Sequence, residues 1–232
     1  MEKRALRYRC LVLDHDDTAV MSTPLIHYPA HVKAMKDLRP AHAPIDLDGW
    51  VRKMFSPGFE PYLREELGLT TDEMAQNYRV WREVTSAIVP EFFPGILAVL
   101  AEFRRRGGIL VVVSHSEVGF VQRDYRAASA ANEGRVSPDL VFGGNVKAEE
   151  RKPHPFPVIA AINRFGLAKR DVVVVDDLRS GLDMAEAAGV DFVAAGWGHS
   201  IPEIKQIFQQ RSRLYCETVM DFGGFLLDSP AS

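Results

Sequence analysis

The stretch CLVLDHDDTAV, residues 10–20, joins a short apolar run to three carboxylates within four residues. These carboxylates belong to Asp14, Asp16 and Asp17, and they repel one another unless a positive charge lies among them. The apolar run before them has the composition of a strand buried on both faces, as in a parallel sheet covered by helices. The stretch is therefore either a solvated turn or a site that holds a cation.

Four more apolar runs follow, most of them rich in β-branched residues, and amphipathic helical patterns lie between them. A strand followed by a helix, repeated along the chain, predicts an α/β fold with a Rossmann-like, doubly wound parallel sheet. The expected strands lie within residues 108–114, 139–144, 171–177 and 191–198, and the helical patterns within residues 95–108, 155–167 and 181–189.

Residues 21–90 interrupt this alternation, because they contain helical patterns and no convincing strand. Thr70 or Thr71 is suited to cap the last of these helices. We therefore expect an α/β core domain of residues 1–20 and 91–232, with a smaller all-helical domain inserted after the first strand. The helical patterns lie around residues 28–38, 47–55, 59–68 and 70–89.

The composition is that of an ordinary globular chain of 232 residues, with 47% apolar residues, 25% charged residues and a net charge of −3. There is no strongly basic field of the kind that binds nucleic acid, and no apolar run approaches the ~20 residues of a membrane span. The apolar run after the basic residues 1–9 is too short for a signal peptide. Two cysteines make no disulfide framework, so we expect a reducing, cytoplasmic setting. The oligomeric state stays open.

Polar side chains gather where the predicted strands end. In doubly wound folds ligands bind at the carboxyl ends of the strands, so these side chains are expected to converge at one edge of the sheet. They are Asp14, Asp16 and Thr18 after the first strand, Ser114, His115 and Ser116 after the second, Lys152 in the loop before the fourth, and Asp176 and Asp177 after the fourth.

Each kind of side chain in this set has a use if the ligand is a phosphate ester. Mg²⁺ binds one or two carboxylates together with phosphate and water. One aspartate can attack phosphorus and form an aspartyl-phosphate, while a second carboxylate moves the proton. A lysine and a hydroxyl can hold the charged oxygens during phosphoryl transfer.

Four segments, in order along the chain, resemble the motifs of the haloacid dehalogenase superfamily. The match covers residues 8–18 and about 92–198, and the helical insert stands where many members carry a helical cap. The resemblance therefore implies a core domain with a cap. The four segments are DHDDT, VVVSHS, RKPHP and VVVVDDLRSGLDMAEAAG.

The resemblance also implies a role for each matching residue. Asp14 would be the nucleophile and a metal ligand, and Asp16 would be the general acid and base, with its backbone carbonyl on the metal. Ser114 and Lys152 would bind the phosphoryl group, and Lys152 would also offset the charge of the nucleophile. His115, next to Ser114, is a further candidate for contact with the phosphorylated substrate.

The acidic fourth motif departs from the commoner family pattern. Asp177 falls where the first aspartate of that motif usually lies, and we expect it to bind the metal directly. The position of the second aspartate is Gly181, so Asp176 is expected to contribute directly or indirectly instead. In the first motif, Asp17 stands where glycine is frequent, and it has no assigned role.

The resemblance implies a Mg²⁺-dependent phosphatase acting on a small phosphorylated metabolite through an aspartyl-phosphate. Asp16 makes a carbon–halogen reaction unexpected, because dehalogenase members lack this second aspartate. A phosphomutase, which returns the phosphoryl group to a sugar, stays open as an alternative. So does a receiver-type signalling domain, although such a domain has no need of an acid and base at Asp16.

Overall fold

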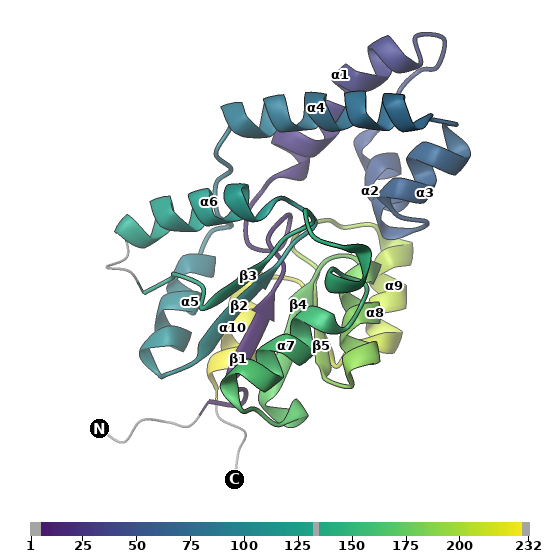
Figure 1. Cartoon of the computed structure of the whole chain (residues 1–232). Helices are drawn as coiled ribbons and strands as arrows, with labels where there is room; N and C mark the ends of the chain where they lie inside the picture. The colour runs from purple at the N-terminus through teal and green to yellow at the C-terminus, as the bar shows by residue number, and fades with distance from the viewer. Residues whose placement is uncertain (1–5, 132–134, 229–232) are drawn as a thin grey trace. The chain divides into compact units, whose positions relative to one another are not determined.

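The computed structural model describes residues 6–131 and 135–228 (Figure 1). Two compact units divide the chain. Residues Met1–Val20 and Phe92–Ser232 form the first, which we call the α/β unit, and Met21–Glu91 form the second, which we call the helical unit. That the helical unit is a cap domain stays a prediction.

A parallel sheet forms the centre of the α/β unit, with the strand order β3-β2-β1-β4-β5-β6. All of its neighbouring strands pair in parallel, which confirms the α/β fold predicted from the alternating pattern. The sixth strand was not predicted. The strands are β1 (Cys10–Leu13), β2 (Ile109–Val113), β3 (Leu140–Phe142), β4 (Val172–Asp176), β5 (Asp191–Ala195) and β6 (Leu214–Cys216).

Helices cover both faces of this sheet (Figure 1). Leu11 and Leu13 of β1 belong to a core cluster that includes residues of α5, α6 and α10, while Cys10 and Val12, which alternate with them, are equally buried. Alternate residues of a strand point to opposite faces, which explains why the run is apolar throughout. The helices are α5 (Ile96–Arg105), α6 (Val118–Ala131), α7 (Phe156–Phe165), α8 (Arg179–Ala188), α9 (Pro202–Arg211) and α10 (Val219–Leu227), with short turns at η3 (Ala148–Glu150) and η4 (Lys169–Asp171).

The helical unit has its own core, and α1 packs along α4. Thr70 caps α4, and its side chain and that of Glu73 satisfy each other's backbone N–H groups in a capping box. Trp50 and Tyr62 are buried in the core of this unit. The elements are η1 (Thr23–His27), α1 (Tyr28–Leu38), α2 (Leu47–Phe55), α3 (Phe59–Pro61), η2 (Tyr62–Glu66) and α4 (Thr71–Ala87).

Two expectations drawn from the composition concern the cysteines and membrane-spanning segments. Cys10 and Cys216 are both buried and neither forms a disulfide. Within residues 6–131 and 135–228, no helix has the length and apolar character needed to span a bilayer. The first five residues of the basic N-terminal stretch lie outside the described residues.

Candidate active site

The carboxyl ends of β1, β2 and β4 bring the predicted residues together. Asp14 follows β1, and its N–H donates to the carbonyl of Val175 in β4 at 2.9 Å. Ser114 follows β2, and its N–H donates to the carbonyl of Phe142 in β3 at 2.9 Å. Asp14, Ser114 and Lys152 are all less than 5% exposed. Buried polar groups of this kind require partners, and other polar groups at the same strand ends provide them.

Lys152 supplies the positive charge that the crowded carboxylates require. Its ammonium donates to Oδ1 of Asp14 and, at 2.6 Å, to Oδ2 of Asp176. Burial lowers the pKa of Lys152, but the carboxylates of Asp14 and Asp176 more than offset that effect, so its pKa is raised. The lysine is therefore charged, and it joins two strand ends that would otherwise repel each other.

One ammonium does not balance all of the acids around it. Burial raises the pKa of Asp14 well above its ordinary value, and Asp176 adds to this shift while Lys152 opposes it. Burial also raises the pKa of Asp177 well above its ordinary value, and Asp14 adds to the increase. The site therefore carries more negative charge than its lysine offsets, which is the electrostatic setting of a cation site.

Asp14, Asp176 and Asp177 could hold that cation. Each offers a buried carboxylate oxygen, and these oxygens lie within 4.8 Å of one another. An all-oxygen set of carboxylates suits a hard divalent cation such as Mg²⁺ better than a softer metal. The donor chemistry and the excess negative charge therefore both fit a divalent metal.

Asp16 makes different contacts. Its Oδ2 accepts hydrogen bonds from the hydroxyls of Ser114 at 2.9 Å and Ser116 at 2.8 Å. The N–H of Ser116 in turn donates to the Ser114 hydroxyl at 2.8 Å. Ser116, which was expected at this edge without an assigned role, belongs to the immediate surroundings of Asp16. Asp14 and Asp16 therefore have different environments although one residue separates them.

A family model described as haloacid dehalogenase-like hydrolase matches residues 8–189. The chain belongs to the haloacid dehalogenase-like hydrolase family. A phosphoglycolate phosphatase of Photorhabdus laumondii is 27% identical over 121 residues, which are 52% of this chain and 50% of that protein. One from Xanthomonas campestris is 42% identical over 62 residues, which are 27% of this chain and 28% of that protein. The chain thus spans half the length, or less, of these relatives.

Solved structures of this family share the fold. One from Bacteroides fragilis, described as a haloacid dehalogenase-like hydrolase, has a TM-score of 0.75 at 19% identity. The alignment covers 93% of this chain and 99% of that one. At this identity, the likeness shows that the two chains have the same fold.

Two loop residues that were not assigned to the site from sequence contact the backbone of Thr18 and Asp177 in this haloacid dehalogenase-like hydrolase. The indole N–H of Trp197 donates to the carbonyl of Thr18 at 2.9 Å, and the Thr18 hydroxyl donates to Oδ1 of Asp177 at 3.2 Å. Nε2 of His199 lies 3.1 Å from the carbonyl oxygen of Asp177. Both residues follow β5, so the rule that ligands bind at carboxyl ends of strands could have found them.

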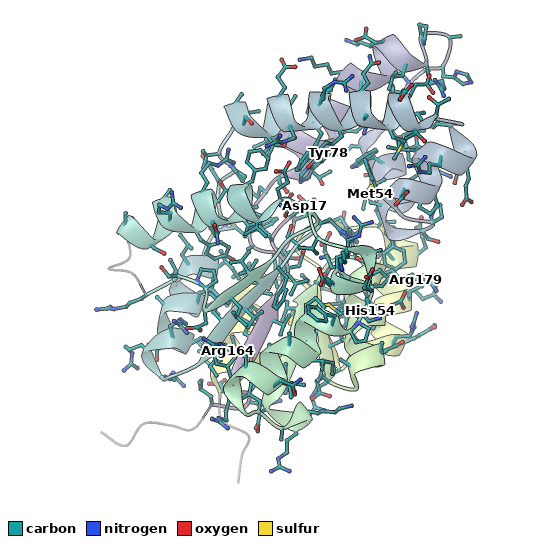
Figure 2. All side chains as sticks on the ribbon, viewed as in Figure 1. Asp17, Met54, Tyr78, His154, Arg164 and Arg179 are labelled. Carbon is teal, nitrogen blue, oxygen red and sulfur yellow. The ribbon has the colours of Figure 1, made fainter. Side chains whose placement is uncertain are left out.

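The backbone explains why glycine is frequent at the position of Asp17. This residue has a φ of 56°, in the left-handed region that glycine adopts freely and that aspartate tolerates better than most residues. It is 9% exposed, and its charge contributes to the raised pKa of Asp177. Figure 2 labels it in the loop beyond the carboxyl end of β1. Asp17 therefore has a conformational explanation and adds further negative charge near the site.

The departure at Gly181 has a steric explanation. A Cβ at this position, in the first turn of α8, would lie 2.2 Å from Oδ2 of Asp176. Asp176 therefore occupies the space that a side chain at position 181 would need. His115, the further substrate candidate, is exposed, and its Nε2 lies 3.0 Å from the hydroxyl of Ser180 in the same turn.

Proposed function

We propose that this protein is a Mg²⁺-dependent phosphatase that hydrolyses a small phosphorylated metabolite through an aspartyl-phosphate. One observation carries the proposal. Asp14 contacts a charged buried lysine within a cluster of carboxylates, whereas Asp16, two residues later, is held by two hydroxyls. Two carboxylates in different environments suit two different chemical roles. The phosphatase names of the partial relatives support the same reaction class.

Asp14 is the proposed nucleophile. Its carboxylate attacks phosphorus, the bond from phosphorus to the alcohol oxygen breaks, and Asp16 donates a proton to that departing oxygen. Asp16 then takes a proton from water, which attacks the same phosphorus and releases phosphate and the Asp14 carboxylate. The hydrogen bond from the Ser116 hydroxyl holds Asp16 in place for both transfers.

The metal ligands in this proposal are Asp14, the backbone carbonyl of Asp16, and Asp177. Asp176 contributes indirectly, because its Oδ1 accepts from the N–H of Leu178 at 2.8 Å and its Oδ2 accepts from Lys152. Both of its oxygens are thus already engaged. When bound, Mg²⁺ offsets the charge of the carboxylates and of the phosphoryl oxygens.

Substrate binding is assigned to Ser114, His115 and Lys152. Lys152 is positioned at the nucleophile itself, where an ammonium would stabilise the negative oxygens of the transferring phosphoryl group. The helical unit is the proposed cap, which would exclude bulk water and provide selectivity for the remainder of the substrate. Phosphoglycolate and other small phosphomonoesters are the first substrates to test.

The test is hydrolysis by the purified protein of p-nitrophenyl phosphate and of a panel of phosphorylated metabolites that includes phosphoglycolate. We expect turnover that requires Mg²⁺, stops with a chelator, returns when Mg²⁺ is added back, and is abolished in Asp14→Asn. Turnover that persists in a folded Asp14→Asn protein would remove the nucleophile assignment. Analysis of the products from sugar phosphates separates a phosphatase from a phosphomutase, and a long-lived phosphoprotein without turnover would indicate a receiver.

A further inference from the structure

His15 lies between the two aspartates of the first motif, and its side chain is buried against α6. Its Nε2 is 3.1 Å from Oδ2 of Asp124, and the two side chains are 2% and 3% exposed. The other oxygen of Asp124 accepts from Nε of Arg123 at 2.8 Å. The ring of Tyr125 packs against the imidazole, with ring centroids 5.6 Å apart.

The backbone of His15 also organises the loop. Its carbonyl oxygen accepts hydrogen bonds from the N–H groups of Ala19 at 2.9 Å and Val20 at 3.0 Å. The main chain of His15 therefore closes the turn that carries Asp16, while its side chain fixes that turn to a helix distant in sequence. Asp14 and Asp16 are attached to the two sides of this fixed point.

The helix that holds His15 is the one that follows the second motif. Helix α6 begins at Val118, two residues after Ser116, whose hydroxyl bonds to Asp16. The same two loops are thus joined twice, once in the site through Asp16 and the serines, and once behind it through His15 and Asp124. A second, directional connection limits how the first-motif loop can rotate relative to the second.

We propose that His15 is a positioning residue, which uses its hydrogen bond to Asp124 to set the relative orientation of the Asp14 and Asp16 side chains. This inference rests on the proposed phosphatase function. An apolar residue at position 15 could fill the same volume, but it would leave Oδ2 of Asp124 buried without this donor and would give the loop no directional contact. The hydrogen bond between His15 and Asp124 therefore fixes the direction of the loop, which apolar packing alone would not do.

Two substitutions at one position test the inference. In His15→Leu, we expect kcat to fall roughly 10–100-fold while KM changes by less than about twofold, because loss of a supporting contact displaces groups used in the transition state. In His15→Gln, the terminal amide nitrogen replaces Nε2 and restores a donor to Asp124, so we expect kcat to recover to within about fivefold of the wild type. A purely structural role would not produce this rescue at equal stability.

A double-mutant cycle with Asp124→Leu adds a second criterion. We expect the kcat of the double variant to be no lower than that of the worse single variant, because both substitutions remove the same contact. The matched control is Tyr8→Phe, which removes a hydrogen bond to the Asp191 carboxylate at 2.6 Å, beyond the amino end of β1. It should lower the melting temperature and leave kcat within about twofold.

Mg²⁺ titration by calorimetry separates this inference from the proposed function. We expect His15→Leu to bind Mg²⁺ several-fold more weakly than the wild type, because Asp14 and the carbonyl of Asp16 flank the substituted residue. If the wild type hydrolyses no phosphate ester but His15→Leu still weakens Mg²⁺ binding, only the proposed function fails. If the wild type is active and a folded His15→Leu protein matches its kcat and its Mg²⁺ affinity, the positioning role is wrong.

Discussion

The substitution Gly181→Ala is expected to displace Asp176 and disable the site with a single added methyl group. A Cβ at position 181 would lie 2.2 Å from Oδ2 of Asp176 and 2.3 Å from its Cβ and Cγ. Non-bonded heavy atoms normally approach to about 3.5 Å, so the Asp176 side chain must move by more than ~1 Å. That movement pulls its carboxylate away from Lys152, which it contacts at 2.6 Å.

The movement of the Asp176 side chain has two consequences, one for the stability of the protein and one for its kcat. Overpacking of this kind costs about 1–3 kcal/mol of unfolding free energy. A displacement of ~1 Å in a group that holds Lys152, which is proposed to bind the phosphoryl group, can lower kcat about 100-fold. We therefore expect Gly181→Ala to be less stable than the wild type and nearly inactive, although alanine is the better helix former.

Gly224→Ala is the matched control, because position 224 is an exposed residue of α10 and an added Cβ there meets nothing within 4 Å. It should gain up to ~1 kcal/mol and keep full activity. Urea unfolding followed by circular dichroism and initial rates with p-nitrophenyl phosphate measure the two effects. A Gly181→Ala protein as stable and as active as Gly224→Ala would refute the steric reasoning.

Three more predictions concern the charges. Lys152→Met should lose about 3–5 kcal/mol of stability in urea unfolding without Mg²⁺, because it leaves buried carboxylates without their ammonium; an unchanged midpoint would contradict this. The raised pKa values of Asp14 and Asp177 mean that the metal-free folded state gains protons more readily than the unfolded state, so stability falls as pH rises above about 4. Mg²⁺ should therefore raise Tm more at pH 8 than at pH 5, and an equal or smaller rise at pH 8 would oppose the metal site. Burial lowers the pKa of His31 to about 4, so relative to His31→Leu the wild type should lose about 3 kcal/mol as pH falls from 6.5 to 4, and parallel pH profiles would count against this.

The sequence was sufficient for strands β1, β2, β4 and β5 because these are buried on both faces. The VVVV run of β4 and the CLVL run of β1 are apolar throughout, and such runs bounded by helical patterns have few other interpretations. Strand β6 was missed because LYC has only three residues and two of them are only partly buried, so neither its length nor its apolar content distinguishes it from a loop.

The motifs identified the residues proposed to carry the chemistry, and they did not identify the residues that support them from elsewhere in the fold. Asp14 and Lys152 were identified from motifs, and the structure brings their charged groups into contact. The contact of His15 with Asp124 spans 109 positions in sequence, and nothing around Asp124 distinguishes it from a solvated helix residue. The conflict at Gly181 was visible only once the Asp176 rotamer was known.

The most direct test of the account is chemical identification of the residue that receives the phosphoryl group. An aspartyl-phosphate is an acyl phosphate, so borohydride added during turnover reduces it to an alcohol and converts that aspartate to homoserine. The account predicts that peptide mass spectrometry will find homoserine at position 14, only when Mg²⁺ and substrate are both present. Homoserine at another aspartate, or none while substrate is being consumed under the same conditions, would contradict the assignment of Asp14 as the nucleophile.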